Sequence, residues 1–453
     1  MQIETTPIPG LLVVRLDVPR DNRGWFKENW QRAKMTAQGL PDFGPVQNNI
    51  SFNNARGATR GIHAEPWDKL ASAAQGFFFC ACVDLRAGDS FGRVFTITMD
   101  ETIAVFVPRG VANGYQALTD NATYSYLVND HWSEASIPYY SYLNLADPTV
   151  AIPWPIDLAE AEISDKDRHH PFLDEVKPVA PRQTLILGGN GQLGRALGEI
   201  YPQARRIDIA DLDLNDPAQI KAFPWADFGI LINAAAWTNV DGAETAEGRL
   251  GAWKANAEVP ATLARIAQAH RKILVHISSD YVFDGSHLRW TEQDSFAPLS
   301  VYGQSKAAGD IAVSLTPRHY LIRTSWVVGD GKNFLRTMGD LADKGICPTV
   351  VDDQIGRLTH TSNLAAAIKH LLDSAAPFGT YNCTDGGDPV SWAEIARAVF
   401  AAHGRDPEDV TPVTTEQYYA GKAGIAPRPA HSTLDLAKLE ATGYKVPVFP
   451  LGA

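Results

Sequence analysis

Two stretches of this sequence combine residue types that could perform acid–base chemistry. In the first, Arg60-Gly-Ile-His63 places a guanidinium and an imidazole three residues apart, and Lys69 follows shortly after. Tyr124 and Tyr126 alternate along a β-rich run, so they share one face of a strand. The set supplies a base that titrates near neutral pH, a phenol that can donate a proton, and cations for phosphates. Each residue alone is typical of a solvated barrel rim, but together they indicate a site.

The second stretch is Tyr302-Gly-Gln-Ser-Lys306, at the start of a predicted helix. A spacing of four places the tyrosine and the lysine on one face of that helix. We expect the ammonium to lower the pKa of the phenol and so prepare it to protonate an alkoxide. Ser279, which closes the preceding strand, provides a hydroxyl at the same end of the predicted sheet. Such a tyrosine–lysine pair is common on solvated helices, so its meaning depends on the residues around it.

A nucleotide-binding motif lies upstream of that pair. The apolar run 184–187 leads into Gly188-Gly-Asn-Gly191-Gln-Leu-Gly194, and a helical pattern follows at once. The three glycines let the backbone turn tightly and approach a pyrophosphate at the positive end of the helix. Asp208 ends the next apolar run, about 20 residues on, where a carboxylate would meet the ribose hydroxyls. A glycine triplet alone also fits an ordinary flexible turn, but with Asp208 and the tyrosine–lysine pair it predicts a dehydrogenase.

The secondary-structure pattern changes near residue 180, which divides the chain into two predicted domains. Residues 1–178 contain short β-rich runs and one helical segment, which predicts an all-β jelly roll of the cupin type. Residues 183–453 alternate strands with helices, which predicts an α/β, doubly wound Rossmann domain with a small C-terminal substrate-binding part. The proline-rich residues between 169 and 181 are predicted to form a short, stiff connector. His169 and His170 are predicted to be surface residues, because no third metal ligand lies nearby in the sequence.

Hydrophobic periodicity locates the elements of both domains. In the first domain it predicts strands at 11–18, 76–85, 94–99, 104–107, 123–128 and 139–145, and a helix at 31–39. In the second domain it predicts strands at 184–187, 206–209, 229–235, 272–278, 320–325 and 379–383. The helices predicted there are 193–200, 243–269, 304–314, 334–344, 364–374 and 392–403.

Composition limits the classes of protein that this chain can be. Its 453 residues are 45% hydrophobic and 20% charged, as in an ordinary soluble protein of two or three domains. The net charge of −12 argues against a nucleic-acid partner, because phosphate binding needs a basic surface. The four cysteines lack metal-ligand spacing, and the longest apolar run, around 77–83, is too short to span a bilayer. We therefore expect a cytoplasmic protein with no membrane and no nucleic-acid partner, and we predict no metal ligands.

The first domain resembles the dTDP-4-dehydrorhamnose 3,5-epimerase family over essentially its whole length. The matching landmarks are Asp21-x-Arg23-Gly with Glu28, Gln47-x-Asn49, Arg60-Gly-x-His63, Lys69, Tyr126, Trp154-Pro155 and Ser164-Asp-Lys-Asp167. The resemblance implies that His63 removes protons from the carbons flanking a C4 ketone and that Asp167 orients it. It also implies that Tyr126 returns a proton on the opposite face and that Lys69 stabilises the enolate oxygen. The substrate-binding residues that it implies are Arg23, Glu28, Gln47, Asn49, Arg60, Asn113 and Trp132.

Two positions depart from the pattern of that family. Asn113 stands in a segment where the family usually has a histidine, and an amide can hydrogen-bond a ketone oxygen but cannot carry charge. Whether both carbons or only one are epimerised therefore stays open. His131-Trp132 replaces the usual tyrosine pair, although Trp132 can still stack on a thymine base.

The second domain resembles the dTDP-4-dehydrorhamnose reductases, which are extended short-chain dehydrogenases, over most of its length. The matching pieces are Gly191-Gln-Leu-Gly194, Leu212-Asp213, Val240-Asp241-Gly-Ala-Glu244, Asn256, the Ser279 segment, Tyr302/Lys306, Arg323-Thr-Ser-Trp326, Asp353-Gln-x-Gly356 and Arg428-Pro429. The resemblance implies that hydride passes from a nicotinamide to C4 of the ketosugar while Tyr302 protonates the oxygen. Lys306 would fix the ribose and Ser279 would orient the ketone. The predicted cofactor-binding residues are Gly188, Gly191, Gln192, Leu193, Gly194, Asp208, Asp213, Ala234, Ala235, Tyr302 and Lys306.

The two resemblances describe consecutive steps on one sugar nucleotide, which implies a bifunctional enzyme of dTDP-L-rhamnose biosynthesis. It would epimerise dTDP-4-dehydro-6-deoxy-D-glucose and then reduce the C4 ketone with NADPH or NADH. Asp208 favours NADH, whereas Arg205 and Arg206 could meet the 2′-phosphate of NADPH. A bound Mg²⁺ in the reductase half stays open, and we expect a homodimer.

Two alternatives remain beside this prediction. The first is the synthesis of a different dTDP-6-deoxyhexose, by partial epimerisation or by reduction on the opposite face. The second is a non-catalytic dinucleotide-binding scaffold. An intact serine, tyrosine and lysine in the reductase half argue against that scaffold, as does the epimerase-like domain in front of it.

Overall fold

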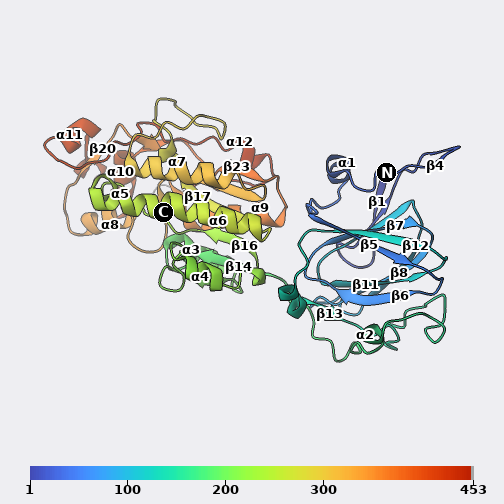
Figure 1. Ribbon diagram of the computed structural model, residues 1–453. Helices are drawn as coiled ribbons and strands as arrows, with labels where there is room; N and C mark the ends of the chain where they lie inside the picture. The colour runs from blue at the N-terminus through green and yellow to red at the C-terminus, as the bar shows by residue number, and fades with distance from the viewer. Residues whose placement is uncertain (450–453) are drawn as a thin grey trace. The chain divides into compact units, whose positions relative to one another are not determined.

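The chain forms two compact units in the computed structural model, which describes residues 1–449 (Figure 1). The first unit is Met1–Pro181, and the second begins at Arg182. No helix among residues 1–449 is long and apolar enough to cross a membrane.

The first unit is a sandwich of two antiparallel sheets, as expected for a jelly roll (Figure 1). One sheet has the order β1-β2-β10-β7-β12-β5 and the other β13-β6-β11-β8-β9. The first sheet consists of β1 (Gln2–Thr5), β2 (Leu12–Arg15), β5 (Gln47–Asn53), β7 (Lys69–Gln75), β10 (Ile103–Val107) and β12 (Ala122–Val128). The second consists of β6 (Thr59–Ala64), β8 (Phe78–Asp84), β9 (Val94–Met99), β11 (Val111–Ala117) and β13 (Ser141–Tyr142). A hairpin of β3 (Arg20–Asp21) and β4 (Gly24–Trp25), the helices α1 (Arg32–Ala37) and α2 (Asp165–Arg168), and a 3-10 helix (Glu134–Tyr139) complete the unit.

Strand β8 lies at the centre of the packing because it is buried on both faces. Phe78, Cys80 and Cys82 point into the core between the two sheets, where they meet side chains of the first sheet. Phe79 and Val83 point the other way and pack under the segment that follows β13. This second core explains why the run around β8 is continuously apolar rather than alternating.

The proline-rich residues before the second unit, predicted to form a short, stiff connector, are packed against the first unit. Leu173 and Val176 are buried in the outer core beneath β8. The amide of Val179 donates to the carbonyl of Leu85 at 2.7 Å, and the amide of Ala87 donates to the carbonyl of Val179. The prolines keep this segment from forming regular secondary structure. Its apolar side chains and backbone hydrogen bonds nevertheless hold it against the sandwich.

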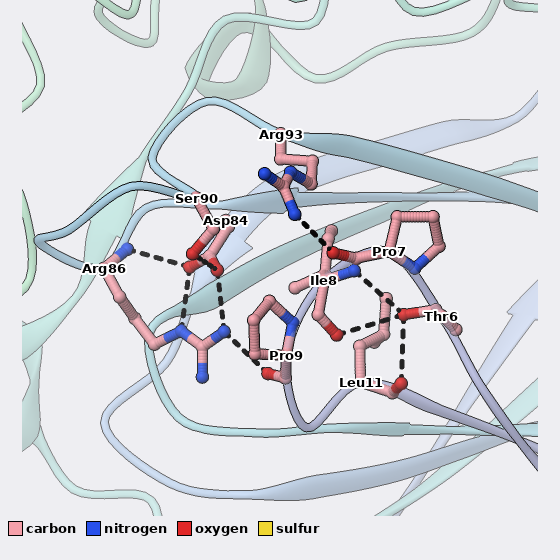
Figure 2. Close-up of polar contacts among 9 residues, drawn as sticks. All are labelled: Thr6, Pro7, Ile8, Pro9, Leu11, Asp84, Arg86, Ser90 and Arg93. Carbon is pink, nitrogen blue, oxygen red and sulfur yellow. Dashed lines mark hydrogen bonds and ion pairs between the residues drawn. The ribbon is translucent and has the colours of Figure 1, made fainter.

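Figure 2 shows how one corner of the sandwich is closed by charged side chains. Arg93 donates to the carbonyl of Pro7 at 2.8 Å, and Arg86 donates to the carbonyl of Pro9 at 2.7 Å. Asp84 holds Arg86 through a two-pronged ion pair, and it also accepts from the Ser90 hydroxyl at 2.8 Å. The prolines leave their carbonyls without strand partners, so these arginines satisfy them and join the turn between β1 and β2 to the end of β8.

The strands that carry most of the polar landmarks were not predicted. β6, β7 and β11 are rich in glycine and alanine, which favour strands weakly. All seven residues of β11 are buried, and β7 lies between β10 and β12. Pairing with two neighbours and burial therefore determine these strands, not local propensity.

The second unit is a doubly wound α/β fold, as predicted. Its six-stranded sheet has the order β15-β14-β16-β17-β18-β23, with every neighbouring pair parallel. These strands are β14 (Gln183–Leu187), β15 (Arg205–Ile207), β16 (Phe228–Asn233), β17 (Ile273–Ser279), β18 (His319–Thr324) and β23 (Gly379–Asn382). The helices are α3 (Gln192–Ile200), α4 (Pro217–Ala222), α5 (Ala246–Trp253), α6 (Val259–Ala269), α7 (Val301–Ser314), α8 (Phe334–Asp343), α9 (Thr361–Asp373), α10 (Trp392–Ala402), α11 (Thr415–Tyr419) and α12 (Ala437–Glu440). Three short pairs lie outside the main sheet: β19 (Val327–Val328) with β22 (Thr359–His360), β20 (Thr349–Val351) with β25 (Thr411–Val413), and β21 (Ile355–Gly356) with β24 (Val390–Ser391).

Helices cover both faces of this sheet, and each face has its own core. On β14, Ile186 faces a core shared with α3, α9 and α12, whereas Leu185 and Leu187 face a core shared with α6 and α7. The same alternation continues along β16 and β17. Because the strands are buried on both sides, their apolar runs are nearly continuous, which is typical of a parallel sheet.

The long helix predicted for 243–269 is broken in the structure. It consists of a 3-10 turn, α5, a π-helical turn over Lys254–Glu258, and α6. Pro260 lies in the first turn of α6 and cannot donate a backbone hydrogen bond. The π-helical turn presents Asn256, whose amide accepts from the Trp237 backbone N–H at 2.9 Å and donates to the Ser305 hydroxyl at 3.1 Å. That side chain therefore connects the end of β16 to α7.

Candidate functional site

The predicted base and its carboxylate meet at the edge of the jelly roll. His63 lies on β6, and its Nε2 donates to Asp167 Oδ1 at 3.0 Å. Asp167 belongs to the short helix α2, which begins where the Ser164 hydroxyl accepts from the Asp167 backbone N–H. The sequence thus folds a serine cap and an aspartate into one turn that points its carboxylate at the imidazole.

The carboxylate of Asp167 is almost fully buried. Burial opposes its charge, but the hydrogen bonds from His63 and from the Gly61 amide, at 3.1 Å, keep its pKa below the usual value. Gly61 has φ +122° and passes so close to β11 that a Cβ there would lie 2.6 Å from the Cα of Gly114. Only glycine fits this position, and the close approach brings its amide to Asp167.

A second group of polar residues is centred on Lys69, which is 6% exposed. Its ammonium donates to Asn113 Oδ1 at 2.8 Å and pairs with Glu65 at 3.0 Å. It also lies 4.9 Å from the ring centre of Tyr126. Asn113 sits directly opposite His63 in the pairing of β11 with β6. Burial first, and then the charge of Glu65, raise the pKa of Tyr126 to about 12, so the phenol holds its proton at neutral pH.

Strand β5 has an inverted pattern that marks the wall of this site. Its inward residues are polar: Gln47 donates to Asn49 at 2.9 Å, and Ser51 hydrogen-bonds the phenol of Tyr115. Its outward residues Ile50 and Phe52 are 67% and 54% exposed. An inner face without apolar side chains indicates a polar ligand rather than a core.

The remaining predicted substrate residues are placed differently. Arg60, on β6, is exposed; it makes a long contact to Asn53 at 3.4 Å and also interacts with the phenol of Tyr115. Trp132 is 55% exposed, and its backbone N–H donates to Gln47. Arg23 pairs with Asp21 in the projecting β3–β4 hairpin, and Glu28 pairs with Lys34 (Figure 1). The structure therefore gathers His63, Asp167, Lys69, Tyr126 and Asn113 but leaves Arg23 and Glu28 with local partners.

His170 is a member of this site that the sequence reasoning missed. It is 7% exposed, not a surface residue as predicted, and its Nε2 lies 3.7 Å from Asp167 Oδ1. Its ring stacks on Tyr142 with centroids 4.8 Å apart and meets the edge of His63 at 5.2 Å. Burial lowers the pKa of His170. His170 lies just beyond the end of α2 (Asp165–Arg168), and its closeness in sequence to Asp167 was the signal that could have found it.

The second unit contains a cavity of about 1180 Å³ at the carboxyl ends of its strands. In open α/β sheets, ligands bind in the crevice at this edge. Nearly all predicted cofactor and catalytic residues line it: Gly188, Gly191, Gln192, Leu193, Asp208, Asp213, Ala234, Ala235, Ser279, Tyr302 and Lys306.

Gly194 is the exception, and its function is packing. A Cβ at Gly194 would lie 2.1 Å from the carbonyl oxygen of Gly188. Gly188 has φ +76°, and a Cβ built on it would lie only 2.6 Å from the backbone nitrogen of Ala235. These contacts bring the start of α3 close to the ends of β14 and β16, so a cofactor can reach the exposed amides of the helix.

Ser279, Tyr302 and Lys306 converge at one end of the cavity. The Ser279 hydroxyl donates to Asp280 Oδ1 at 2.9 Å and also contacts the Tyr302 phenol. Lys306 is 2% exposed, and its ammonium donates to the carbonyl of Ile277 at 2.6 Å. Tyr302 and Lys306 lie on α7, which begins where Ser300 accepts from the Gly303 amide.

Burial dominates the protonation of this group. It raises the pKa of Tyr302 to about 12, contrary to the lowering that we expected from the neighbouring lysine. Burial also lowers the pKa of Lys306 to about 8, against the opposing charge of Asp310 one helical turn on. Asp310 is paired with Arg323 at 3.0 Å in the same interior. At neutral pH the phenol is therefore protonated and the lysine charged, which are the forms that an acid and its cation need.

The ribose end of the cavity is lined by Asp208 but not by the neighbouring arginines. Asp208 accepts from the Asn190 amide at 2.8 Å. Arg205 lies over the ring of Phe223 at 5.1 Å, and the guanidinium of Arg206 lies against Gly198 of α3.

Two aromatic residues in the cavity wall were not assigned a function from the sequence. Trp326 has φ +45°, an uncommon conformation for a bulky side chain, and stacks on Trp392 with centroids 3.9 Å apart. Both line the cavity. An isolated tryptophan pair has no sequence pattern, so only the fold brings the two together.

Both halves match known families. Residues 182–449 match the family described as RmlD substrate binding domain, and residues 5–175 match dTDP-4-dehydrorhamnose 3,5-epimerase. The chain belongs to these two families, one in each half.

Individual relatives agree with this assignment. The epimerase-family half is 48% identical over 184 residues to the Streptococcus pyogenes serotype M6 "Protein RmlC homolog", covering 40% of this chain and 92% of that protein. The reductase-family half is 35% identical over 274 residues to the dTDP-4-dehydrorhamnose reductase of Aggregatibacter actinomycetemcomitans, covering 56% of this chain and 91% of that protein. A solved structure of Bacillus anthracis dTDP-4-dehydrorhamnose reductase in complex with NADP is similar with a TM-score of 0.54 and 33% identity, covering 59% of this chain and 95% of that one.

Proposed function

We propose that this chain catalyses two consecutive steps of dTDP-L-rhamnose biosynthesis. The first half epimerises dTDP-4-dehydro-6-deoxy-D-glucose, and the second half reduces the C4 ketone of the product. One observation carries the proposal: each half holds a complete acid–base set, His63–Asp167 with Lys69 and Tyr126, and Ser279–Tyr302–Lys306. The membership of the halves in an epimerase family and a reductase family supports it.

In the epimerase half, His63 acts as the base. Its Nε2–H is bonded to Asp167, so Nδ1 is the nitrogen that carries a lone pair and can accept a proton. Asp167 stabilises the imidazolium that forms. The ammonium of Lys69 faces the negative charge that develops on the ketone oxygen. Tyr126, which is protonated at neutral pH, returns a proton on the other face and so inverts the carbon.

In the reductase half, Tyr302 acts as the acid. When bound, the nicotinamide supplies a hydride to C4 of the sugar. Tyr302 then gives its proton to the C4 oxygen, Ser279 holds that oxygen by a hydrogen bond, and Lys306 binds the ribose hydroxyls and keeps positive charge beside the phenol. To reach the oxygen, the Ser279 hydroxyl exchanges its bond to Asp280 for one to the substrate.

For the cofactor, we infer a preference for NADH over NADPH. The tight glycine approaches at 188 and 194 fit a pyrophosphate, and Asp208 would accept from a free 2′-hydroxyl but repel a 2′-phosphate. Arg205 and Arg206 are held by Phe223 and by α3. Residues 182–449 contain no cluster of three His, Cys, Asp or Glu side chains close enough to hold Mg²⁺, so the proposed mechanism gives that ion no role.

We infer that the protein forms a homodimer through the epimerase half. Strand β5 is an edge strand, and it presents Ile50 and Phe52 to solvent. Trp25 and Phe26, near the hairpin, are 39% and 69% exposed. An apolar edge of this kind is stable in water when another chain covers it. Light scattering of Ile50→Lys against the unchanged protein tests this inference.

One experiment tests the proposed function directly. The full chain is incubated in deuterated water with dTDP-4-dehydro-6-deoxy-D-glucose, first without and then with NADH, and the sugar is examined by NMR. We expect deuterium at C3 and C5 in the first stage and dTDP-L-rhamnose in the second. Deuterium at a single carbon would instead support the synthesis of another 6-deoxyhexose, the alternative that Asn113 raises. Absence of both exchange and reduction would reject the proposal in favour of a binding scaffold.

A further inference from the structure

His170 presents a buried polar group that the proposed mechanism does not use. Neither of its ring nitrogens has a partner with hydrogen-bond geometry, although the Leu143 backbone interacts with it weakly. Its side chain is 5% exposed and is fixed between Tyr142 and His63. A buried nitrogen without a hydrogen bond requires an explanation, and an ion that binds there is one.

The atoms around His170 have the arrangement of a metal site. His170 Nε2 and His63 Nε2 lie 3.7 Å and 3.0 Å from the same oxygen, Asp167 Oδ1. The three ligand atoms lie within 4.8 Å of one another, and among residues 1–449 this is the one cluster of three such groups. Bonds of about 2.0–2.2 Å to a tetrahedral ion place neighbouring ligands about 3.3 Å apart, so small side-chain shifts suffice.

The surroundings of the cluster also suit a metal ion. The second oxygen of Asp167 accepts from the Gly61 amide, which fixes the carboxylate as outer partners do in metal sites. Two imidazoles and one carboxylate favour zinc, cobalt and other transition metals over Mg²⁺. His63 is 30% exposed, which leaves an entry path and room for a water as fourth ligand.

We propose that His63, Asp167 and His170 form a binding site for a divalent transition-metal ion of the Zn²⁺ type, and that occupation of this site and proton abstraction by His63 exclude each other. Without metal, the Nε2–H of His63 points at Asp167 and its Nδ1 is free to accept a proton. When Nε2 binds the ion, the remaining ring proton of the neutral imidazole is on Nδ1. The nitrogen that must act as the base is then already protonated, so the epimerase half cannot start its reaction.

The binding of the metal is tested on the full chain with Co²⁺ as the probe. We expect Co²⁺ to produce the intense visible absorption of a four-coordinate site, and Zn²⁺ to abolish it by displacement. His170→Asn and His170→Phe should each weaken Co²⁺ binding by at least about tenfold. Even the loss of an outer partner that only orients a metal ligand costs about that much affinity, and here a ligand itself is removed. The matched control is His169→Asn, because His169 is the exposed neighbour and should leave the titration unchanged. Equal affinity in the His169 and His170 variants would overturn the site. The phenylalanine variant keeps the packing on Tyr142, so loss of binding there is not loss of the fold.

The claim that a bound metal prevents proton abstraction rests on the proposed role of His63 as the base. It is tested separately, by deuterium incorporation. Stoichiometric Zn²⁺ should stop deuterium incorporation into the ketosugar, and a chelator should restore it. Oxidation of dTDP-L-rhamnose by NAD⁺ in the same sample should continue, because residues 182–449 hold no such cluster. If Co²⁺ binds as expected but deuterium exchange persists, the metal site stands and the exclusion is wrong. If exchange is absent even without metal, the proposed function of this half fails while the Co²⁺ result is unaffected.

Discussion

The two candidate sites solve opposite proton-transfer problems with different arrangements of charge. In the mechanism proposed for the epimerase half the central group is a base, His63, and the buried carboxylate of Asp167 at 3.0 Å would stabilise the positive charge that it acquires. In the mechanism proposed for the reductase half the central group is an acid, Tyr302, and the buried ammonium of Lys306, four residues on along α7, would supply the positive charge. The charged helper has the opposite sign in each case and is nearly inaccessible to water in both. The comparison teaches that each half pairs its reacting group with a buried charge of the sign that its proton transfer needs, where water screens that charge little.

The largest expected effect is from Tyr302→Phe, which removes the acid while keeping the ring. Reduction should fall on the order of 10²–10⁴-fold, the usual cost of removing a positioned general acid. Deuterium exchange by the epimerase half should be unchanged. Stopped-flow loss of nicotinamide absorbance measures the first quantity. Tyr281→Phe, whose ring centre lies 5.7 Å from that of Tyr302, is the control and should cost much less.

A comparable loss is expected from His63→Ala in the other half. Deuterium incorporation should fall on the order of 10²–10⁴-fold, with reduction of a pre-epimerised ketosugar intact. Asp167→Asn should slow exchange less completely, because the amide no longer stabilises the imidazolium. NMR of the sugar carbons measures both, and His169→Ala controls for the loss of a histidine. Deuterium exchange at the normal rate in His63→Ala would show that another residue is the base.

The pH dependence of cofactor binding should report the charge of Lys306. Lys306 has its pKa lowered to about 8, so its charge is lost as pH rises through that value. NADH binding, followed by fluorescence, should therefore weaken above about pH 8, and Lys306→Met should remove this pH dependence. The stability consequence has the opposite sign: the unfolded lysine titrates near 10.4, so stability should rise with pH between about 8 and 10.4.

A smaller effect is expected for Asp208→Asn, which tests the cofactor preference. The ratio of kcat/KM for NADH to that for NADPH should fall about tenfold, the value of one hydrogen bond to a charged group. Arg206→Ala is the control, since its guanidinium lies against α3. An unchanged ratio in Asp208→Asn would show that the ribose is recognised by other groups.

The smallest effect is expected from cutting the chain between Pro181 and Arg182. Each unit has its own core, and the segment through Val179 is packed on the first unit. Both fragments should fold cooperatively and keep their separate activities, as judged by circular dichroism and the two assays. Aggregation of either fragment would show that the halves depend on each other for folding.

The second unit was much easier to predict from sequence than the first, and the reason is physical. Parallel strands buried on both sides produce apolar runs, and the helices between them have a regular period, so the positions of β14 through β18 were close to those predicted. In the jelly roll, β6, β7 and β11 owe their strand conformation to neighbours that are distant in sequence. Distances such as that between His63 and Asp167, 104 residues apart, follow only from that pairing.

The same difference applies to individual site residues. The glycine motif, Ser279, Tyr302 and Lys306 were found because their spacing follows the strand–turn–helix and helix periods. His170 was misplaced because its burial depends on Tyr142 and the cover over β8, which no local pattern encodes. The raised pKa of Tyr302 was missed for a related reason: it comes from burial and from the charges of Asp280 and Asp310, which only the fold brings around the phenol.

Gly61 has a consequence for how this protein can vary over evolution. It touches no substrate in the proposed mechanism, yet its missing side chain admits the Cα of Gly114 and its amide donates to Asp167. Any larger residue would push apart the two strands that carry His63 and Asn113. In a library of all single substitutions, position 61 should therefore be as intolerant as the base itself. Selection for activity would hold this backbone position fixed, while the exposed outer face of β5 remains free to adapt to whatever covers it.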